Sequence, residues 1–401
     1  MSRQWILFTA GALVAVACGG GSAAGGSTTL PPPSADSQST EGTLAGDQFP
    51  SGESALDNMT AESFPDPLVP PEDIISGGPP PDGIPPIDDP NFVSVDQADA
   101  WLEDTEPVVA LEIDGDVRAY PIQVMIWHEI VNDTVGGIPV TITYCPLCNS
   151  AISYVGEIDG QATTFGTSGR LYASALVMYD RATESLWTHF DGRAVVGVLT
   201  GHQLDPVASP LLAWSDFKAI YENAQVLDRD ATGHSRPYGS NPYVGYDNPD
   251  ASPFLFRGDL DDRSRAMQRV VGVRIDDGAR AWTLDVISEG AAEATNTTLG
   301  ETNLVIFWTA GQASAIESDS IGEGRDVGSV GVFNASVDGE VLTFAAQDGV
   351  FVDQQTQSTW DITGQAVAGP LAGTRLDRIP HLDTFWFAWS TYAPGTDLVE
   401  P

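Results

Sequence analysis

Two cysteines, Cys145 and Cys148, stand three positions apart in the first half of the chain. Thiolates at this spacing can bind one metal ion together, and imidazole from a histidine elsewhere can complete tetrahedral or trigonal coordination. A methionine thioether adds a soft ligand of the kind that copper accepts. The sequence therefore predicts a copper or zinc site with the candidate ligands Cys145, Cys148, His128, His189 and Met178.

The same cysteine pair has two other interpretations. It fits thiol–disulfide exchange, because a Cys-x-x-Cys pair tunes the pKa and redox potential of its thiols. However, thioredoxin-like proteins place this motif at a helix N-terminus, whereas residues 151–155 have the pattern of a strand. The pair also fits a small structural disulfide in an oxidising compartment. In that case the protein is a binding or scaffold module without catalytic function.

Arg170 and His189 are candidate catalytic residues for a third interpretation, an enzyme that acts on a small anionic substrate. A guanidinium group can clamp an anion, and an imidazole can transfer protons near neutral pH. The pair His128-Glu129 begins like the zinc-protease motif His-Glu-x-x-His. Asn132 stands where the second histidine is required, which excludes that motif.

The chain contains two similar segments. Residues 109–120 align with residues 271–282 at an offset of 162, and further matches follow in the same order. The second copy keeps the framework positions but lacks the cysteines, both candidate histidines and the methionine. We therefore expect an internal duplication in which only the first copy carries the site.

Short alternating apolar runs, separated by Asp-Gly and Gly-Gly turns, predict strands and hairpins. Helical patterns are short, at residues 98–103, 122–131 and 214–226. The expected fold class is α+β: mainly β with a few short helices, arranged as two similar β-rich halves. We place the first repeat, with the Cys/His site, at residues 91–262 and the second, degenerate repeat at residues 263–401.

Several of these residues lie in motifs that resemble a bacterial and archaeal family. The motifs are His128-Glu-Ile-Val-Asn-Asp133, Tyr144-Cys-Pro-Leu-Cys-Asn-Ser-Ala151, Ser168-Gly-Arg-Leu171, Met178-Tyr-Asp-Arg181 and Ser185-Leu-Trp187. The family is catalogued as domain of unknown function 3179, and the resemblance covers about residues 91–400. It implies a secreted or lipoprotein setting and no assigned activity.

The charge balance restricts the partners of the protein. The chain has 56 acidic and 17 basic residues, which gives a formal net charge of -39. No phosphate-neutralising patch can be assembled from so few cations, so nucleic acid is excluded as a partner. The chain also contains no Gly-rich phosphate loop and no Gly-x-Ser-x-Gly hydrolase motif.

The N-terminus has the pattern of a secretion signal. Residues 1–17 carry one positive charge and then a largely apolar run that is shorter than the roughly 20 residues of a membrane-spanning helix. Cys18 follows small residues, as does the lipidated cysteine of bacterial lipoproteins. Residues 18–90 are rich in Gly, Ser, Pro and acid and are predicted to form a disordered tether. We therefore expect an extracytoplasmic lipoprotein, anchored to the cell membrane through Cys18, with no identified small-molecule or protein partner.

Overall fold

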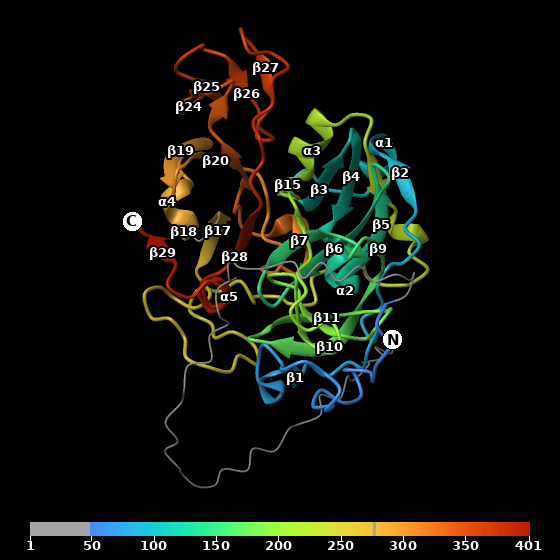
Figure 1. Cartoon of the computed structure of the whole chain (residues 1–401). Coiled ribbons are helices and arrows are strands. Elements are labelled where there is room, and N and C mark those ends of the chain that lie inside the picture. Colours follow the sequence, from blue (N-terminus) through green and yellow to red (C-terminus); the bar gives the residue numbers. More distant parts are fainter. Residues whose placement is uncertain (1–48, 276–277) are drawn as a thin grey trace, which may run out of the picture.

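The computed structural model describes residues 49–275 and 278–401, and Figure 1 shows how they are arranged. The predicted signal peptide and the candidate lipidation site Cys18 lie outside the described residues. The described chain is mostly β-strand with a few short helices, which confirms the mainly β fold class. Among these residues no helix has the length and hydrophobicity needed to span a bilayer.

The first half forms three sheets. One has the strand order β15-β3-β4-β16-β2, with bounds Leu211–Ala213, Pro107–Ile113, Asp116–Pro121, Gln225–Leu227 and Phe92–Ser94. The second has the order β14-β7-β6-β5, with bounds Pro206–Val207, Ser150–Val155, Ile138–Cys145 and Ile130–Val135. The third has the order β1-β10-β11-β12-β13, with bounds Ile75–Ser76, Phe165–Tyr172, Ala175–Asp180, Leu186–Thr188 and Arg193–Val196. A small hairpin pairs β8 (Glu157–Ile158) with β9 (Gln161–Ala162).

The second half also forms three sheets. One has the order β28-β17-β18-β29, with bounds His381–Phe385, Arg269–Ile275, Gly278–Thr283 and Asp397–Val399. The next has the order β19-β20-β21, with bounds Ala292–Leu299, Thr302–Thr309 and Ser329–Asn334. The last has the order β24-β25-β26-β27, with bounds Phe344–Gln347, Val350–Asp353, Thr359–Trp360 and Ala366–Ala368. A small hairpin pairs β22 (Ser336–Val337) with β23 (Glu340–Val341).

The helices are short and lie between strands. They are α1 (Val95–Ala98), α2 (Ile122–His128), α3 (Trp214–Ile220), α4 (Leu284–Ile287) and α5 (Trp386–Tyr392). Single 3₁₀ turns occur at Pro71–Asp73, Arg229–Ala231 and Ile321–Glu323. The first helix begins earlier than the predicted range 98–103, because Ser94 and Gln97 form a capping box that starts it at Val95.

Turn chemistry explains the hairpins that position the site. Asp114 and Gly115 join β3 to β4 with φ angles of 49° and 82°, and Gly136 and Gly137 join β5 to β6 with φ angles of 57° and 83°. A two-residue hairpin turn of type I′ needs positive φ at both positions, which Asp and Gly tolerate. These local signals are the reason that the strands could be predicted from sequence.

Apolar side chains of the two halves share buried clusters. One cluster includes Cys145 and Trp187 from the first half and Trp389 from the second. Another includes Trp214 from the first half and Trp360 from the second. In Figure 1 the orange-to-red second half accordingly lies directly beside the green first half. The halves therefore pack against each other through these two apolar clusters.

Residues 49–90 correct the prediction of a disordered tether. Ala55, Val69, Ile74 and Ile87 are buried in the same cluster as the cysteines. Strand β1 extends the sheet edge at β10, and Figure 1 shows this blue segment against β10. The composition argument failed because a few well-spaced apolar side chains anchor the Pro-rich chain, and an existing sheet edge supplies hydrogen-bond partners that composition does not reveal.

Candidate metal centre

The two cysteines lie in the turn that joins β6 to β7. Cys145 is the last residue of β6 and pairs with Ser150, the first residue of β7. Asn149 closes the turn with a φ of 48°, a conformation that Asn adopts more readily than most residues. The motif is therefore part of a β-hairpin and does not lie at a helix N-terminus.

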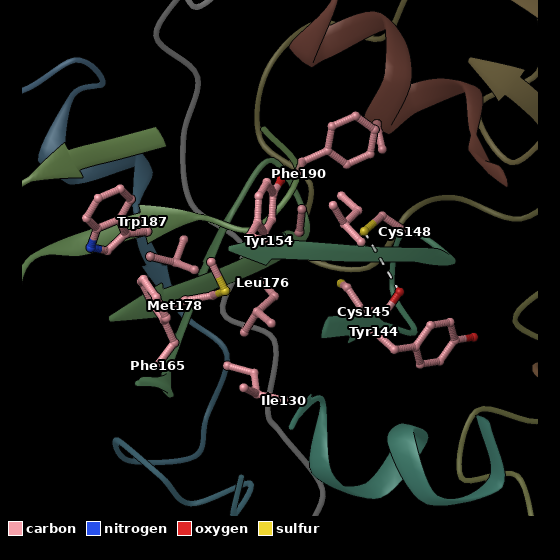
Figure 2. Close-up of a cluster of buried hydrophobic side chains, with 14 of the residues drawn as sticks. Ile130, Tyr144, Cys145, Cys148, Tyr154, Phe165, Leu176, Met178, Trp187 and Phe190 are labelled. Carbon is pink, nitrogen blue, oxygen red and sulfur yellow. Dashed lines mark hydrogen bonds between the residues drawn. The ribbon is translucent and has the colours of Figure 1, made fainter. Parts of the chain in front are cut away.

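His189 reaches the cysteines from a different sheet. It follows β12, and its backbone N–H donates to the carbonyl oxygen of Leu176 on β11 at 3.1 Å. Cys145, Cys148 and His189 each offer one potential ligand atom, and these three atoms lie within 4.8 Å of one another. All three residues are fully buried. Figure 2 shows the two cysteines close together among apolar side chains.

Hydrogen bonds fix the orientation and the tautomer of the His189 ring. Nδ1 lies 2.7 Å from the Thr143 hydroxyl, which donates its only proton to the carbonyl oxygen of Ile152 at 2.7 Å. Thr143 must therefore accept a hydrogen bond from Nδ1–H. Burial lowers the pKa of His189 to about 3, so the ring is neutral and Nε2 carries a lone pair. Nε2 lies 2.7 Å from the Ser150 hydroxyl and 4.0 Å from the Cys148 sulfur.

The two thiols differ in acidity. Burial alone raises the pKa of Cys145, but a hydrogen bond from the Cys148 thiol lowers it. Backbone amides of Leu176, Cys148 and Leu147 add further hydrogen bonds, and the pKa of Cys145 ends below its ordinary value. Burial and the neighbouring Cys145 raise the pKa of Cys148 well above its ordinary value. Cys145 is therefore the more acidic of the two thiols, and a neutral imidazole lies beside them.

A buried carboxyl group lies near Cys145. Glu129 ends α2 with a φ of 58° and is 7% exposed. Burial and the charge of Cys145 raise the pKa of Glu129 well above its ordinary value. Burial therefore favours the neutral form of the Glu129 carboxyl group.

Residues of the second half attach the cysteine turn. The guanidinium group of Arg269 donates to the side-chain oxygen of Asn149 at 3.3 Å. Arg269 is itself fixed by buried ion pairs with Asp247 at 3.0 Å and Asp383 at 3.2 Å. Breaking a buried, hydrogen-bonded ion pair is costly. The turn is therefore attached to a rigid part of the neighbouring sheet.

Two of the predicted ligands lie outside this cluster. Nδ1 of His128 is 2.7 Å from the carbonyl oxygen of Pro85, and Nε2 is 2.7 Å from the Tyr238 hydroxyl. Both ring nitrogens are thus engaged, and burial lowers the pKa of His128 to about 4. Met178 is buried on β11, and in Figure 2 the side chain of Leu176 lies between it and Cys145.

Arg170, the other candidate catalytic residue, faces the N-terminal segment. Its guanidinium group donates to the backbone carbonyl oxygen of Leu56 at 3.1 Å. His189 faces the cysteine turn instead, through its contact with Ser150. The structure therefore does not bring Arg170 and His189 together in one site.

Sequence reasoning missed Thr143 and Ser150, the two hydroxyl residues that contact His189. Thr143 stands two positions before Cys145 on β6, so both side chains project from the same face of the strand. Ser150 pairs directly with Cys145 across the hairpin. The strand period was the signal that could have placed both hydroxyls beside the cysteines.

Comparison with known proteins identifies one relationship. A family model described as "Protein of unknown function (DUF3179)" matches residues 81–396 of the chain. The matched region contains the cysteine turn, His189 and both β-rich halves. No curated protein and no solved structure matches the chain.

Proposed function

The chain therefore belongs to the DUF3179 family, and we propose that its first half binds one copper or zinc ion. The ligands are Cys145, Cys148 and His189. The observation that carries this proposal is that three donor atoms suited to these metals lie within 4.8 Å of one another in a buried site. The His189 tautomer supports it, because the unprotonated Nε2 is the nitrogen nearest the Cys148 sulfur.

The donor atoms need to move little to coordinate a metal. Metal–sulfur bonds of about 2.3 Å and metal–nitrogen bonds of about 2.0 Å separate tetrahedral donors by about 3.5 Å. The Cys148 sulfur and His189 Nε2 are 4.0 Å apart. Binding would release the Cys148 proton and turn the Ser150 hydroxyl away from Nε2.

Charge and coordination number distinguish the two metals. Two thiolates and a neutral imidazole neutralise Zn²⁺ in a site that excludes water, which limits the cost of burying the charge. Three soft or borderline ligands without a fourth suit Cu⁺. The Ser150 hydroxyl is the polar group best placed to complete a four-coordinate zinc site, since it contacts both the Cys148 sulfur and His189 Nε2.

Elemental analysis of the full chain, purified without added metal, tests the proposal. The expected result is one copper or zinc ion per wild-type chain and loss of that ion in Cys145→Ser, Cys148→Ser and His189→Asn. His128→Asn is the matched control, because its ring contacts Pro85 and Tyr238 instead of the sulfur atoms. Absence of metal after incubation with Cu⁺ and with Zn²⁺, or a metal content that is independent of these ligands, would overturn the proposal.

Thiol–disulfide exchange is the second candidate function. It is favoured by the unequal acidity of Cys145 and Cys148, which resembles an attacking thiolate beside a resolving thiol. It is disfavoured by burial, because both residues are 1% exposed or less and a protein disulfide cannot reach them. Two free thiols that cycle with a mild oxidant, in a chain that binds no metal, would support this function.

A non-catalytic scaffold with a structural disulfide is the remaining alternative. Both cysteines are free thiols in the structure. The scaffold interpretation expects no free thiols and no metal in the purified protein, and lower stability when both cysteines are replaced by serine. Thiol titration alongside elemental analysis therefore separates all three interpretations.

We also infer that the two halves arose by internal duplication. In each half an antiparallel hairpin (β3–β4 or β17–β18) precedes a short helix and a three-stranded meander (β5–β7 or β19–β21). In each half a late strand pairs in parallel with the second strand of the hairpin, β16 with β4 and β29 with β18. Similar stability losses for matched variants of the two halves are the result expected from a duplication.

The location of the protein is proposed from its N-terminal sequence. We propose that Cys18 is lipidated and anchors the chain to the outer face of a cell membrane, which is its partner. Cys18→Ser is expected to move the protein from the membrane fraction to the soluble fraction. Unchanged membrane association of this variant would rule out a lipid anchor at Cys18.

A further inference from the structure

A cavity of about 380 Å³ lies between the two halves. Its lining includes Ala151, Phe190, Arg193, Arg274, Trp389 and Tyr392. Ala151 follows Ser150 and Phe190 follows His189, so the cavity and the candidate metal centre share a wall. The three proposed metal ligands do not line the cavity, which makes it a separate site.

One wall of the cavity consists of aromatic rings. Phe190 and Tyr392 stack with ring centroids 4.6 Å apart, and Trp389 lies 6.5 Å from Phe190. Trp389 packs on Gly272 of β17, where a Cβ atom would overlap the indole ring. All three rings are 5% exposed or less, so they form a closely packed apolar wall on one side of the cavity.

A guanidinium group stands at the aromatic wall. Arg274 lies two positions after Gly272 on β17, and its Nη2 donates to the backbone carbonyl oxygen of Tyr392 at 2.7 Å. The guanidinium carbon also lies 5.2 Å from the centre of the Trp389 ring. The carbonyl oxygen accepts from one of the five N–H groups of the side chain.

Among the described residues, no carboxylate forms a salt bridge with Arg274. Arg269, on the same strand, differs because it forms salt bridges with Asp247 and Asp383. Asp191 also lines the cavity, but its side chain accepts a hydrogen bond from the Thr188 hydroxyl. Burial lowers the pKa of Arg274, although the charge of nearby Asp191 raises it, as expected for a cation that has lost water and whose neighbouring carboxylate is not in salt-bridge contact.

The charges of the cavity define the class of anion. Asp191 and Asp205 line it together with Arg193 and Arg274, and the chain as a whole carries a net charge of -39. Dianions such as phosphate are disfavoured by this surrounding charge. A single carboxylate matches the planar guanidinium group geometrically, and the volume suits a small molecule. We propose that the cavity binds a small monocarboxylate whose carboxylate pairs with Arg274 and whose apolar body lies against the aromatic wall.

Binding of matched acids and amides to the full chain tests this proposal. The probes are benzoate, phenylacetate, 3-phenylpropionate and hexanoate. Each acid is compared with its neutral amide, and inorganic phosphate is tested as a further anion. Binding is measured by ligand-observed NMR and by calorimetry. We expect at least one acid to bind about tenfold more tightly than its amide, because a charge-assisted bond in a desolvated site is strong. Equal binding of every acid and its amide, or tighter binding of phosphate, would overturn the proposal.

Variants locate the binding to the cavity. Arg274→Gln should reduce acid binding to the level of the amide, whereas Arg280→Gln, which removes an exposed arginine of the same hairpin that pairs with Asp397, should leave it unchanged. Ala151→Trp places an indole in the cavity while keeping the Arg274 side chain, and it should abolish binding of acid and amide alike. Persistence of acid binding in either the Arg274 or the Ala151 variant would contradict the assignment. Folded Arg274→Gln should keep its metal content, so failure of this proposal is distinguishable from failure of the metal site.

Discussion

The side-chain hydroxyl of Thr384, on β28 of the second half, donates a hydrogen bond of 2.7 Å to the backbone carbonyl oxygen of Cys148 in the first half. The backbone N–H of Phe385 donates to the same oxygen at 3.3 Å, and the Asn149 side chain donates to the carbonyl oxygen of Asp383 at 3.4 Å. Three consecutive residues of β28 therefore hold the cysteine turn. The second half, which contributes none of the proposed metal ligands, therefore helps to position Cys148.

Thr384→Val tests this attachment, because it keeps the side-chain shape and removes the donor. We expect the dissociation constant for the metal to rise about tenfold, as for other groups that orient metal ligands, and the free energy of unfolding to fall by about 1 kcal/mol. Metal titration and urea denaturation measure the two effects. Thr391→Val is the control, since its hydroxyl donates to the Phe387 carbonyl oxygen at 2.7 Å within α5. The control should lose similar stability without losing metal affinity. Equal metal affinity of both variants would show that β28 does not position Cys148.

Thr143→Val tests the role of the His189 tautomer. The hydroxyl of Thr143 accepts from Nδ1–H and so keeps the lone pair on Nε2. Without it we expect metal affinity to fall by about 10- to 100-fold. Thr141→Val, two positions earlier on β6, removes a buried hydroxyl that donates to the Asn132 side chain at 3.0 Å and serves as the control. Metal affinity that falls equally in both variants would assign the effect to general destabilisation.

The ligand types could be predicted from the sequence, whereas the choice among them required the fold. Thiolates and imidazole are the soft and borderline ligands of this chain, so Cys145, Cys148 and His189 were predicted from chemistry alone. Nothing local separates His189 from His128. The partners of His128 lie 43 and 110 residues away in sequence, at Pro85 and Tyr238. Contacts of this range depend on how the sheets pack.

For the fold, too, local features could be predicted from the sequence and long-range contacts could not. Hairpins such as β3–β4 could be predicted because Asp114 and Gly115 specify the turn locally. The attachment of Thr384 to Cys148 spans 236 residues and has no local signal. The ordering of residues 49–90 was missed for a similar reason. Their composition is that of a disordered chain, and only the edge of β10 and the core around Ile74 and Ile87 make them fold.

Truncation tests the structural role of this N-terminal segment. A chain that begins at residue 91 loses the buried side chains of Val69, Ile74 and Ile87 and exposes the edge of β10. Removing three such side chains should lower the free energy of unfolding by about 5 kcal/mol relative to a chain that begins at residue 49. An exposed strand edge also promotes aggregation. Urea denaturation and light scattering compare the two chains, and equal midpoints would show that the segment does not stabilise the core.

The stability of the protein should depend on pH through Glu106. This residue is 3% exposed and accepts a hydrogen bond of 2.5 Å from the Gln123 side chain. Burial raises its pKa from 4.5 to about 7. Between these values the folded chain keeps a proton that the unfolded chain has released, so stability falls as the pH rises through this window and changes no further above it.

Glu106→Gln isolates this effect, because it replaces the ionisable group with a neutral one of the same size. As the pH rises from about 5 to about 8, the free energy of unfolding of the variant should increase relative to that of wild type by at most about 3 kcal/mol. Urea denaturation of both proteins at the two pH values gives the difference. A stability difference that does not change with pH would show that Glu106 titrates near its ordinary pKa in the folded protein.

Each half contains a buried hydrogen-bond network centred on an aspartate, and the two networks have the same pattern. Asp180 accepts from the Trp187 indole at 3.0 Å and from the Thr183 hydroxyl at 2.9 Å. Asp353 accepts from the Trp360 indole at 3.0 Å, and the hydroxyl three residues after it donates at 2.8 Å. A shared framework role explains why this aspartate occurs in both halves, although only the first half carries the cysteines.

Asp180→Ala and Asp353→Ala are therefore a matched pair. Each leaves the buried indole N–H and the backbone N–H three residues after the aspartate without their acceptor, at a cost of about 1–3 kcal/mol for each group. We expect both variants to lose about 2–4 kcal/mol of unfolding free energy, measured by urea denaturation. Because Trp360 belongs to a cluster that does not contain the cysteines, folded Asp353→Ala should also keep a full complement of metal. A loss in only one of the two variants would contradict the equivalence of the halves, and with it the duplication.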